Sequence, residues 1–344
     1  MRRLLYGVAL CFLWGCEADL EDTWTSYIED TYKVVCPEAP IEIMSSKDEE
    51  SIIRGEDLLN YFNIVQISDS LYYMYYEAFK FKGERDKVKD RFHNYDDFTS
   101  GIYFAYSKDC IHWVKRIPNS LNDDNLVMPT RLFISGCVVM KVSDNEYPFR
   151  MFGLRSIYEE RAIYMWKSKD GVVFEDEKMV LQGLSDTQFA GVERKNRILL
   201  YIRKSVERNG LVRKIGVVTL DFEGNIIEPD YMLKPNYVYN PAASFLNDTY
   251  DLLFPTHFDN RNGDDSAYIK TIIVRGDDAK ECDCNIGDWI DNNELWMIVA
   301  PGTIKINGDT YITYNTRTWS HDEMMPKNGV CKYKLIKIEI NQVF

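Results

Sequence analysis

Hydrophobic and polar residues alternate in short runs along most of the chain, which is the pattern of half-buried β-strands. Two stretches 61 positions apart match, IYFAYSKDCIHW at 102–113 and IYMWKSKDGVVF at 163–174. Each predicts a strand, a Ser-Lys-Asp turn and an aromatic residue that begins another strand. A period of this size indicates repeated sheet units.

The same arrangement recurs as strand pairs whose second members are rich in tyrosine, and each pair is followed by another alternating segment. Five such pairs occur, at 63–79, 136–155, 186–204, 239–259 and 301–319. Strong helical periodicity is absent apart from the region 17–35. Sheets repeated around an axis solve the problem of exposed strand edges. The sequence therefore predicts an all-β fold, a five-bladed β-propeller with four-stranded antiparallel blades.

The N-terminus has the pattern of an export signal. Arg2 and Arg3 precede an apolar run at 4–14 that is too short to span a bilayer. The run meets Gly15 and Cys16, a junction similar to a bacterial lipobox, in which Cys16 would be acylated; cleavage nearby without lipidation is the alternative. We expect a signal peptide at 1–16, a tether and lead-in at 17–50, and the propeller at 51–344.

The net charge and the absence of several motifs argue against some classes of function. The formal net charge of −13 argues against nucleic-acid partners, which are bound by clustered positive charge. No GxxxxGK[ST], GxGxxG or GxSxG pattern occurs. Cys282 and Cys284 are too closely spaced for the usual zinc pattern, and the four histidines are scattered, so we expect no metal site of that kind. The cysteines after Cys16 are expected to form one or two bridges or to be buried thiols.

The SKDG-x-x-F turn, the tyrosine-rich strands, the DTQ that opens the third unit and the NP that opens the fourth resemble five-bladed propeller glycoside hydrolases. The nearest groups are the arabinanase and xylosidase family 43, the invertase and levanase family 32, and relatives of the latter among lipoproteins of gut Bacteroides. The resemblance covers nearly the whole mature chain, but its motifs are repeat motifs. It implies the propeller architecture and a carbohydrate substrate.

Glycoside hydrolysis generally requires two carboxyl groups, which the resembled families draw from different blades. Asp186, in the DTQ stretch similar to the family's inner-strand acid, is the first candidate. Glu77, at the end of the first tyrosine-rich strand, is the second, and Asp259 in the fourth unit is the third. For each, the alternative is a solvated carboxylate at a strand end.

Aligning the units by their second strands places one polar residue of each at the rim of the central cavity: Glu77, Arg155, Arg203, His257 and Arg317. Arginine suits a carboxylate bidentately. We therefore expect the basic members, with Asn240, to bind substrate, including an acidic sugar such as a uronate. Equally, each arginine could pair with a neighbouring carboxylate.

The departures from the resembled families matter. Their first blade opens with an aspartate, whereas this chain has NYFN at 60–63, and Asp57 lies three residues too early. The second unit begins with SGC at 135–137, without the expected Asp-Pro, and the fourth has Asn240 where invertases carry an acid. Either the carboxylates have moved or catalysis has been lost.

The leading interpretation is an exported, lipid-anchored, monomeric glycoside hydrolase that acts on a plant or host glycan in the periplasm or at the cell surface. A glycan-binding lipoprotein that stacks sugars on Tyr61, Phe62, Tyr239 or Trp319 without cleaving them is the alternative. A phosphorylase is a third. No cofactor is expected, although the resemblance leaves room for a structural calcium ion in the central channel. The acidic stretch 259–265 reads as a hairpin tip.

Overall fold

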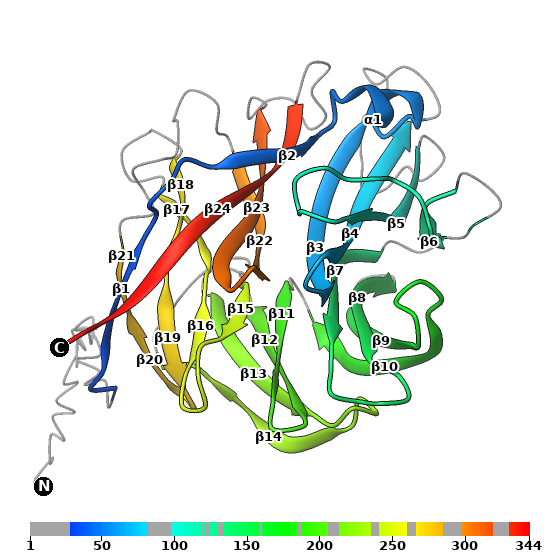
Figure 1. The fold of residues 1–344 in the computed structure, drawn as a ribbon. Coiled ribbons are helices and arrows are strands. Elements are labelled where there is room, and N and C mark those ends of the chain that lie inside the picture. The colour runs from blue at the N-terminus through cyan, green and yellow to red at the C-terminus, as the bar shows by residue number, and fades with distance from the viewer. Residues whose placement is uncertain are drawn as a thin grey trace, which may run out of the picture.

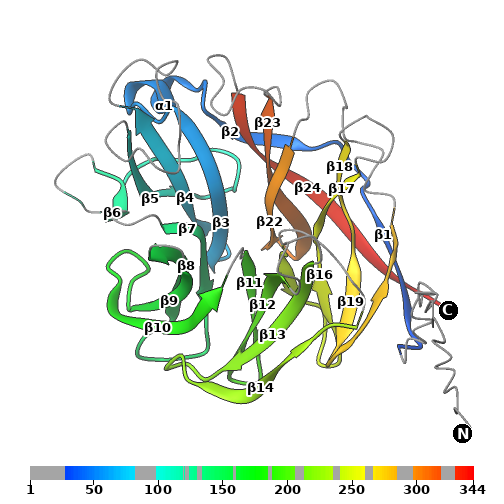
Figure 2. The ribbon, with the colours of Figure 1, turned by 180° about the vertical axis from the view of Figure 1, so that it is seen from behind.

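A computed structural model of the chain describes residues 28–81, 98–118, 120, 124–129, 134–157, 160–184, 188–205, 213–234, 241–259, 266–284, 297–318 and 330–344. The strands in these ranges form five antiparallel blades around a central axis (Figures 1 and 2). The predicted all-β, five-bladed propeller with four-stranded blades is confirmed.

Each blade is an antiparallel meander whose first strand lies nearest the axis. The first three blades follow the chain without interruption: β3 (Leu58–Ser68), β4 (Leu71–Phe81), β5 (Phe98–Ser107) and β6 (Leu126–Pro129); β7 (Ile134–Lys141), β8 (Phe149–Ile157), β9 (Glu160–Ser168) and β10 (Glu175–Leu184); β11 (Phe189–Arg194), β12 (Arg197–Ser205), β13 (Arg213–Leu220) and β14 (Ile226–Met232).

The fourth blade carries an extra hairpin between its second and third strands. The blade consists of β15 (Ala243–Phe245), β16 (Asp251–Leu253), β19 (Ile272–Arg275) and β20 (Asp278–Glu281). The extra hairpin pairs β17 (Thr256–Asp259) with β18 (Ser266–Ile269), and Asp259 lies opposite Ser266. The last residues of β17 and the first of β18 thus flank the predicted hairpin tip.

The fifth blade is completed by the N-terminal part of the chain. Its own strands are β22 (Met297–Ile306), β23 (Asp309–Thr318) and β24 (Val330–Val343), and β1 (Thr31–Val35) and β2 (Ile41–Ser45) pair with β24. β1 also pairs in parallel with β21 (Asp283–Cys284). From the sequence we expected residues 17–50 to precede the propeller. In the structure, the two strands within 31–45 belong to its last sheet. The fifth unit has only three strands of its own, so β24 would otherwise present an open edge.

Tight turns set the register of two inner hairpins. Lys195 and Asn196 join β11 to β12, and Asn307 and Gly308 join β22 to β23, and all four residues have positive φ. Two-residue loops with this geometry match the right-handed twist of the paired strands, and Gly308 adopts its φ of 90° without steric cost.

The hydrophobic core is divided among the five contacts between neighbouring blades. Tyr72, Met74 and Tyr76 face the last blade, whereas Tyr75 and Phe104 face the second. The remaining three contacts have similar clusters of buried aliphatic and aromatic side chains. Alternation along each strand therefore buries both faces of a blade, which explains why few positions in the second strands are polar.

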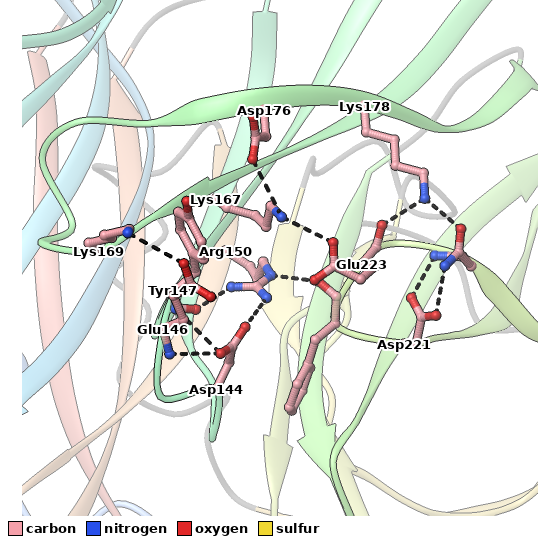
Figure 3. Close-up of polar contacts among 12 residues, drawn as sticks. Asp144, Glu146, Tyr147, Arg150, Lys167, Lys169, Asp176, Lys178, Asp221 and Glu223 are labelled. Atoms are coloured by element: carbon pink, nitrogen blue, oxygen red, sulfur yellow. Dashed lines mark hydrogen bonds and ion pairs between the residues drawn. The ribbon is translucent and has the colours of Figure 1, made fainter.

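A polar clasp at the contact of the second and third blades is shown in Figure 3. The buried Arg150 side chain of β8 donates to the Phe222 carbonyl (2.8 Å), to Asp144 Oδ2 (2.6 Å) and to the Tyr147 carbonyl. Lys178 of β10 donates to the Glu223 carbonyl (2.7 Å). Side chains of the second blade thus hold the β13–β14 turn of the third.

Helical structure contributes little to the described part of the chain, where α1 (Glu49–Ile53) is a five-residue helix. No helix among the described residues is both long and apolar enough to cross a membrane.

Candidate functional site

The first strands of all five blades surround a cavity of about 250 Å³ on the propeller axis. We call it the axial cavity. β3 and β7 line it along most of their lengths. The lining is completed by residues 188–191 and 241–243, at the starts of β11 and β15, and by residues 302–303 in the second half of β22. Residues that are far apart in the sequence therefore share one chamber, as the predicted ring required.

The walls of the axial cavity are mostly apolar, with a few polar side chains. Aromatic and aliphatic residues of β3 and β7 are among the lining residues. Among the described lining residues the one basic side chain is Lys141, whose Nζ donates to the Ile67 carbonyl (3.1 Å), and none is a carboxylate. The other polar lining side chains with hydrogen-bonding amides or hydroxyls are Tyr61, Asn63, Gln66, Gln188 and Thr303.

Three inner strands carry a β-bulge in which two residues lie opposite one residue of the second strand. Asn60 and Tyr61 face Glu77, residues 136–137 face Gly153, and residues 300–301 face Tyr314. Bulges concentrate beside functional sites because they redirect side chains. The bulge in the first blade directs Tyr61 into the axial cavity and Asn60 toward Glu77.

Glu77 is fully buried beside the axial cavity rather than in its lining. The Asn60 side-chain amide donates to Glu77 Oε2, and Asn315 of β23 donates to the Asn60 carbonyl (2.8 Å). Burial, and then the charge of Glu77, raise the pKa of the Cys137 thiol, which is itself part of the lining. A carboxylate from the first blade therefore lies within electrostatic reach of the cavity wall.

The two predicted arginines whose side chains are described lie in different surroundings. Arg155 donates from both terminal nitrogens to Glu177 of β10 (2.8 and 2.7 Å), and its guanidinium lies 4.6 Å from the centre of the Tyr164 ring. This is the pairing with a neighbouring carboxylate that the sequence left open, and Arg155 is outside the lining of the axial cavity. Arg203 is buried, with its backbone amide bound to the Gln188 carbonyl (2.8 Å).

Several predicted site residues lie in parts of the chain for which less is described. His257 and Asp259 belong to β17, opposite Tyr268 and Ser266, and Arg317 of β23 lies opposite Met297; only their backbone positions are described. Asp186, Asn240 and Cys16 lie outside the described residues. Their roles stay predictions.

Of the four aromatic residues predicted to stack on sugars, two are described in the structure and two are not. Tyr61 and Phe62 both line the axial cavity. The Phe62 ring is also stacked on Tyr333, with ring centres 4.0 Å apart, so it belongs to the core between the fifth and first blades. Tyr239 and Trp319 lie outside the described residues.

The described residues include neither a metal-ligand cluster nor a disulfide bond. No group of three or more His, Cys, Asp or Glu residues there is arranged to hold a metal ion. The cysteines after Cys16 are free thiols at Cys36, Cys110, Cys137, Cys282, Cys284 and Cys331.

Sequence reasoning did not identify Gln188, Asn60 or Asn315 as site residues. Gln188 Nε2 donates to the Tyr61 hydroxyl, which joins the third blade to the first. A glycine or proline inside the first strand of the second and fifth units indicates the bulges there, but β3, which carries Asn60, has neither residue, so no local signal marked these three positions.

Comparison with known proteins shows the fold but no family. No family model and no curated protein matches the chain. Among solved structures, the chain is similar to a family 43 glycoside hydrolase protein of Bacillus licheniformis, with 14% identity and a TM-score of 0.50 over 81% of this chain and 52% of that one. The present chain thus spans about half the length of that structure.

Two further structures cover most of both chains. An α-L-arabinofuranosidase of Lactobacillus brevis is 10% identical, with a TM-score of 0.52 over 80% of this chain and 89% of that one. A levansucrase variant of B. subtilis is 12% identical, with a TM-score of 0.52 over 86% of this chain and 89% of that one. The five-bladed propeller is therefore the fold that this chain shares with carbohydrate-active enzymes.

Proposed function

We propose that the protein is a glycoside hydrolase that holds the terminal sugar of a glycan in the axial cavity. The observation that carries the proposal is the cavity itself, to which all five blades contribute apolar walls and a small number of amides and hydroxyls. Its volume of about 250 Å³ lies below the roughly 300–1,000 Å³ of pockets for drug-sized ligands. A single sugar ring, with its apolar face and peripheral hydroxyls, suits that size and lining.

Hydrolysis requires a proton donor and a base or nucleophile on either side of the scissile bond. We assign these roles to Asp186 and Glu77, with Asp259 as the further candidate. Glu77 is supported by its burial beside the cavity wall and by the Asn60 amide that orients its carboxylate. Asp186 precedes the lining residue Gln188 by two positions.

Release of sugar from a panel of plant and host oligosaccharides tests the activity. We expect Asp186→Asn and Glu77→Gln each to lower kcat by at least a hundredfold, while Asp69→Asn, at an exposed turn, leaves it unchanged. Binding of the same oligosaccharides to the two site variants should persist. Full turnover by both variants would contradict the assignment.

An acidic, uronate-like sugar is the substrate class that we propose. Its support is Arg203, a buried basic residue of β12 in a chain of net charge −13, whose backbone amide is bound to the carbonyl of the lining residue Gln188. Arg203→Ala should weaken binding of oligogalacturonates more than binding of neutral oligosaccharides of the same length. Equal losses would exclude the acidic sugar.

A glycan-binding protein without catalytic activity is the second candidate. It is favoured by one observation, that no described residue lining the axial cavity is a carboxylate. The test is to measure binding of a glycan and then the concentration of reducing ends during prolonged incubation. Binding without any increase in reducing ends would establish this function in place of hydrolysis.

We further propose that the protein is exported and lipid-anchored at Cys16. Figure 1 shows β1 beginning on the side of the ring opposite α1, whereas β3 begins beside α1. Metabolic labelling with palmitate tests the anchor, since Cys16→Ser should abolish incorporation and release the protein from the membrane fraction.

A further inference from the structure

We infer that the end of the propeller at which the inner strands finish lies against a zwitterionic phospholipid surface. We call this end the turn face. It comprises the loops that follow the first strands, at 69–70, 142–148, 195–196, 246–250 and 307–308, and those that follow the third strands, at 108–116, 169–174, 221–225 and 276–277. The inference rests on the proposed lipid anchor at Cys16, to which it adds a docking surface.

Contacts between neighbouring blades show that these loops share one end of the ring. Lys141 Nζ at the end of β7 donates to the Ile67 carbonyl at the end of β3 (3.1 Å). The clasp in Figure 3 joins the loop after β7 to the loop after β13 in the third blade. Arg194 at the end of β11 donates to the Asp248 carbonyl in the loop after β15 (2.7 Å). The loops of the first four blades therefore lie side by side.

The chain enters the propeller at the turn face. Asp30, just ahead of β1, accepts hydrogen bonds from the Tyr250 hydroxyl in the loop after β15 (2.5 Å) and from Gln342 near the end of β24 (2.9 Å). Ile28 is 28 − 16 = 12 positions after Cys16, and a chain of that length spans at most about 40 Å. An anchor at Cys16 is therefore attached to the turn face by a tether short enough to bring this face onto the bilayer.

Exposed apolar side chains gather at the turn face. Twelve large apolar side chains are exposed in the described part of the chain, and eight of them lie at this end of the propeller. Six belong to its loops or adjoin them, namely Ile111, Val114, Val173, Ile226, Ile227 and Phe245, and the other two end β24. Because the six come from the first four blades, the apolar positions are spread across the face instead of lining one groove.

This distribution suits a bilayer better than a peptide. Single exposed apolar residues are ordinary on soluble proteins, whereas their concentration on one face indicates a contact surface. A bound peptide or helix needs a groove or a free sheet edge, but a bilayer accepts apolar side chains at scattered points, and its affinity grows with the apolar area buried. The formal net charge of −13 disfavours an anionic lipid surface, so we assign a zwitterionic one.

Photolabelling from the bilayer tests the contact directly. The full chain, as isolated from cells, is mixed with phosphatidylcholine vesicles that contain a phospholipid with a diazirine in its acyl chain, and mass spectrometry locates the label after irradiation. We expect label in 108–116, 169–174 and 226–228, and none in α1, although Ile53 of α1 is 76% exposed. Equal labelling of α1 and the turn face would overturn the inference.

The double variant Ile226→Asn, Ile227→Asn removes two apolar contacts and leaves Phe245 as an unaltered reporter on the same face. Burial of one such side chain corresponds to about tenfold in an equilibrium between docked and undocked protein. Labelling near Phe245 should therefore fall by about tenfold. Ile52→Asn, Ile53→Asn on α1 is the matched control and should keep the wild-type labelling. Undiminished labelling near Phe245 in the first variant would contradict docking through this face.

The anchor and the docking surface fail separately. If palmitate does not label the wild type but the photolabel still locates to the turn face, only the anchor is lost. If the wild type is acylated and bound to vesicles but the turn face carries no photolabel, the docking inference is overturned and the anchor stands. A dimer that Ile226→Asn, Ile227→Asn dissociates, without photolabel on the turn face, would assign this face to contacts between copies of the chain instead.

Discussion

Lys115 and Glu56 form an ion pair that is almost completely shielded from water, with Nζ 2.5 Å from Oε2 and side-chain exposures of 3% and 0%. Nζ also donates to Ser51 Oγ (2.6 Å), and the Tyr76 hydroxyl donates to the second oxygen of Glu56 (2.8 Å). Burial, and then the charge of Glu56, raise the pKa of Tyr76 well above its ordinary value, so this phenol stays protonated and continues to donate. The pair joins α1 to the first blade at the start of β3.

Replacing one partner of this pair should be more destabilising than replacing both. Lys115→Met leaves the Glu56 carboxylate buried without its cation, which typically costs about 3–5 kcal/mol. The double variant Lys115→Met, Glu56→Gln should recover much of that loss. Urea unfolding of the two single variants and the double variant measures the coupling, and additive losses would contradict it.

The Asn315 side chain should stabilise both the ring closure and the orientation of Glu77. Its amide donates to the Asn60 carbonyl across the contact between the fifth and first blades, and Asn315→Ala leaves that buried carbonyl without this donor. We expect a loss of about 1–3 kcal/mol in the free energy of unfolding, together with a lower kcat. Asn341→Ala, at an exposed position of β24, is the control and should change neither quantity. If Asn315→Ala lowered the stability but left kcat unchanged, Asn315 would contribute to ring closure and not to the orientation of Glu77.

The Arg150–Asp144 contact should make stability depend on pH at the acid end. Burial acts to raise the pKa of Asp144, but hydrogen bonds from Arg150 and from the Glu146 and Tyr147 amides outweigh it, and the pKa is lowered. A carboxyl whose pKa is lower in the folded state stabilises the protein above its unfolded pKa near 4, and loses that contribution as pH falls through the folded value.

Asp144→Asn should therefore be less stable than the wild type at pH 7, and the difference should shrink as pH falls below about 4. Thermal unfolding between pH 2.5 and 7 measures it. Asp69→Asn, at an exposed turn, should show no such convergence. A difference that stays constant over this range would show that Asp144 acts through shape rather than charge.

The N-terminal strands should be required for folding of the propeller. β1 pairs with β24 over five residues, and Ile28, Tyr32 and Val34 fill the contact between the fourth and fifth blades. A chain lacking residues 1–27 should keep its cooperative urea transition, whereas one lacking 1–45 should expose the β24 edge and aggregate or unfold. Size-exclusion chromatography and circular dichroism distinguish the outcomes. Equal stability of the two truncations would show that β1 and β2 are dispensable.

Local sequence was sufficient for the number of blades and for the strands and turns of the matching repeats. Alternation along 102–107 and 163–168 corresponds to β5 and β9, and the Ser-Lys-Asp turns follow each strand, with Asp109 and Asp170 accepting from backbone amides. Such turns depend on contacts within a few residues, so a single chain reveals them.

The site was predicted less completely. Glu77 was a predicted catalytic residue and lies beside the cavity without lining it, and Arg155 pairs with Glu177 on the outer strand instead of lining the cavity. An alternating pattern tells which residues share a face of a strand, whereas it does not show which neighbouring strand supplies the counter-charge.

The sequence by itself determined the period, the meander of each blade and the apolar faces between blades, because these follow from alternation and turn chemistry within about 60 residues. Only the tertiary structure decided that β1 closes the ring, that a bulge aims Tyr61 at Gln188, and that Asn315 holds Asn60. Tyr61 and Gln188 are 127 residues apart in the sequence, Asn60 and Asn315 are 255 apart, and β1 and β24 lie near opposite ends of the chain. They form only when the five blades close around one axis, and no local pattern records them.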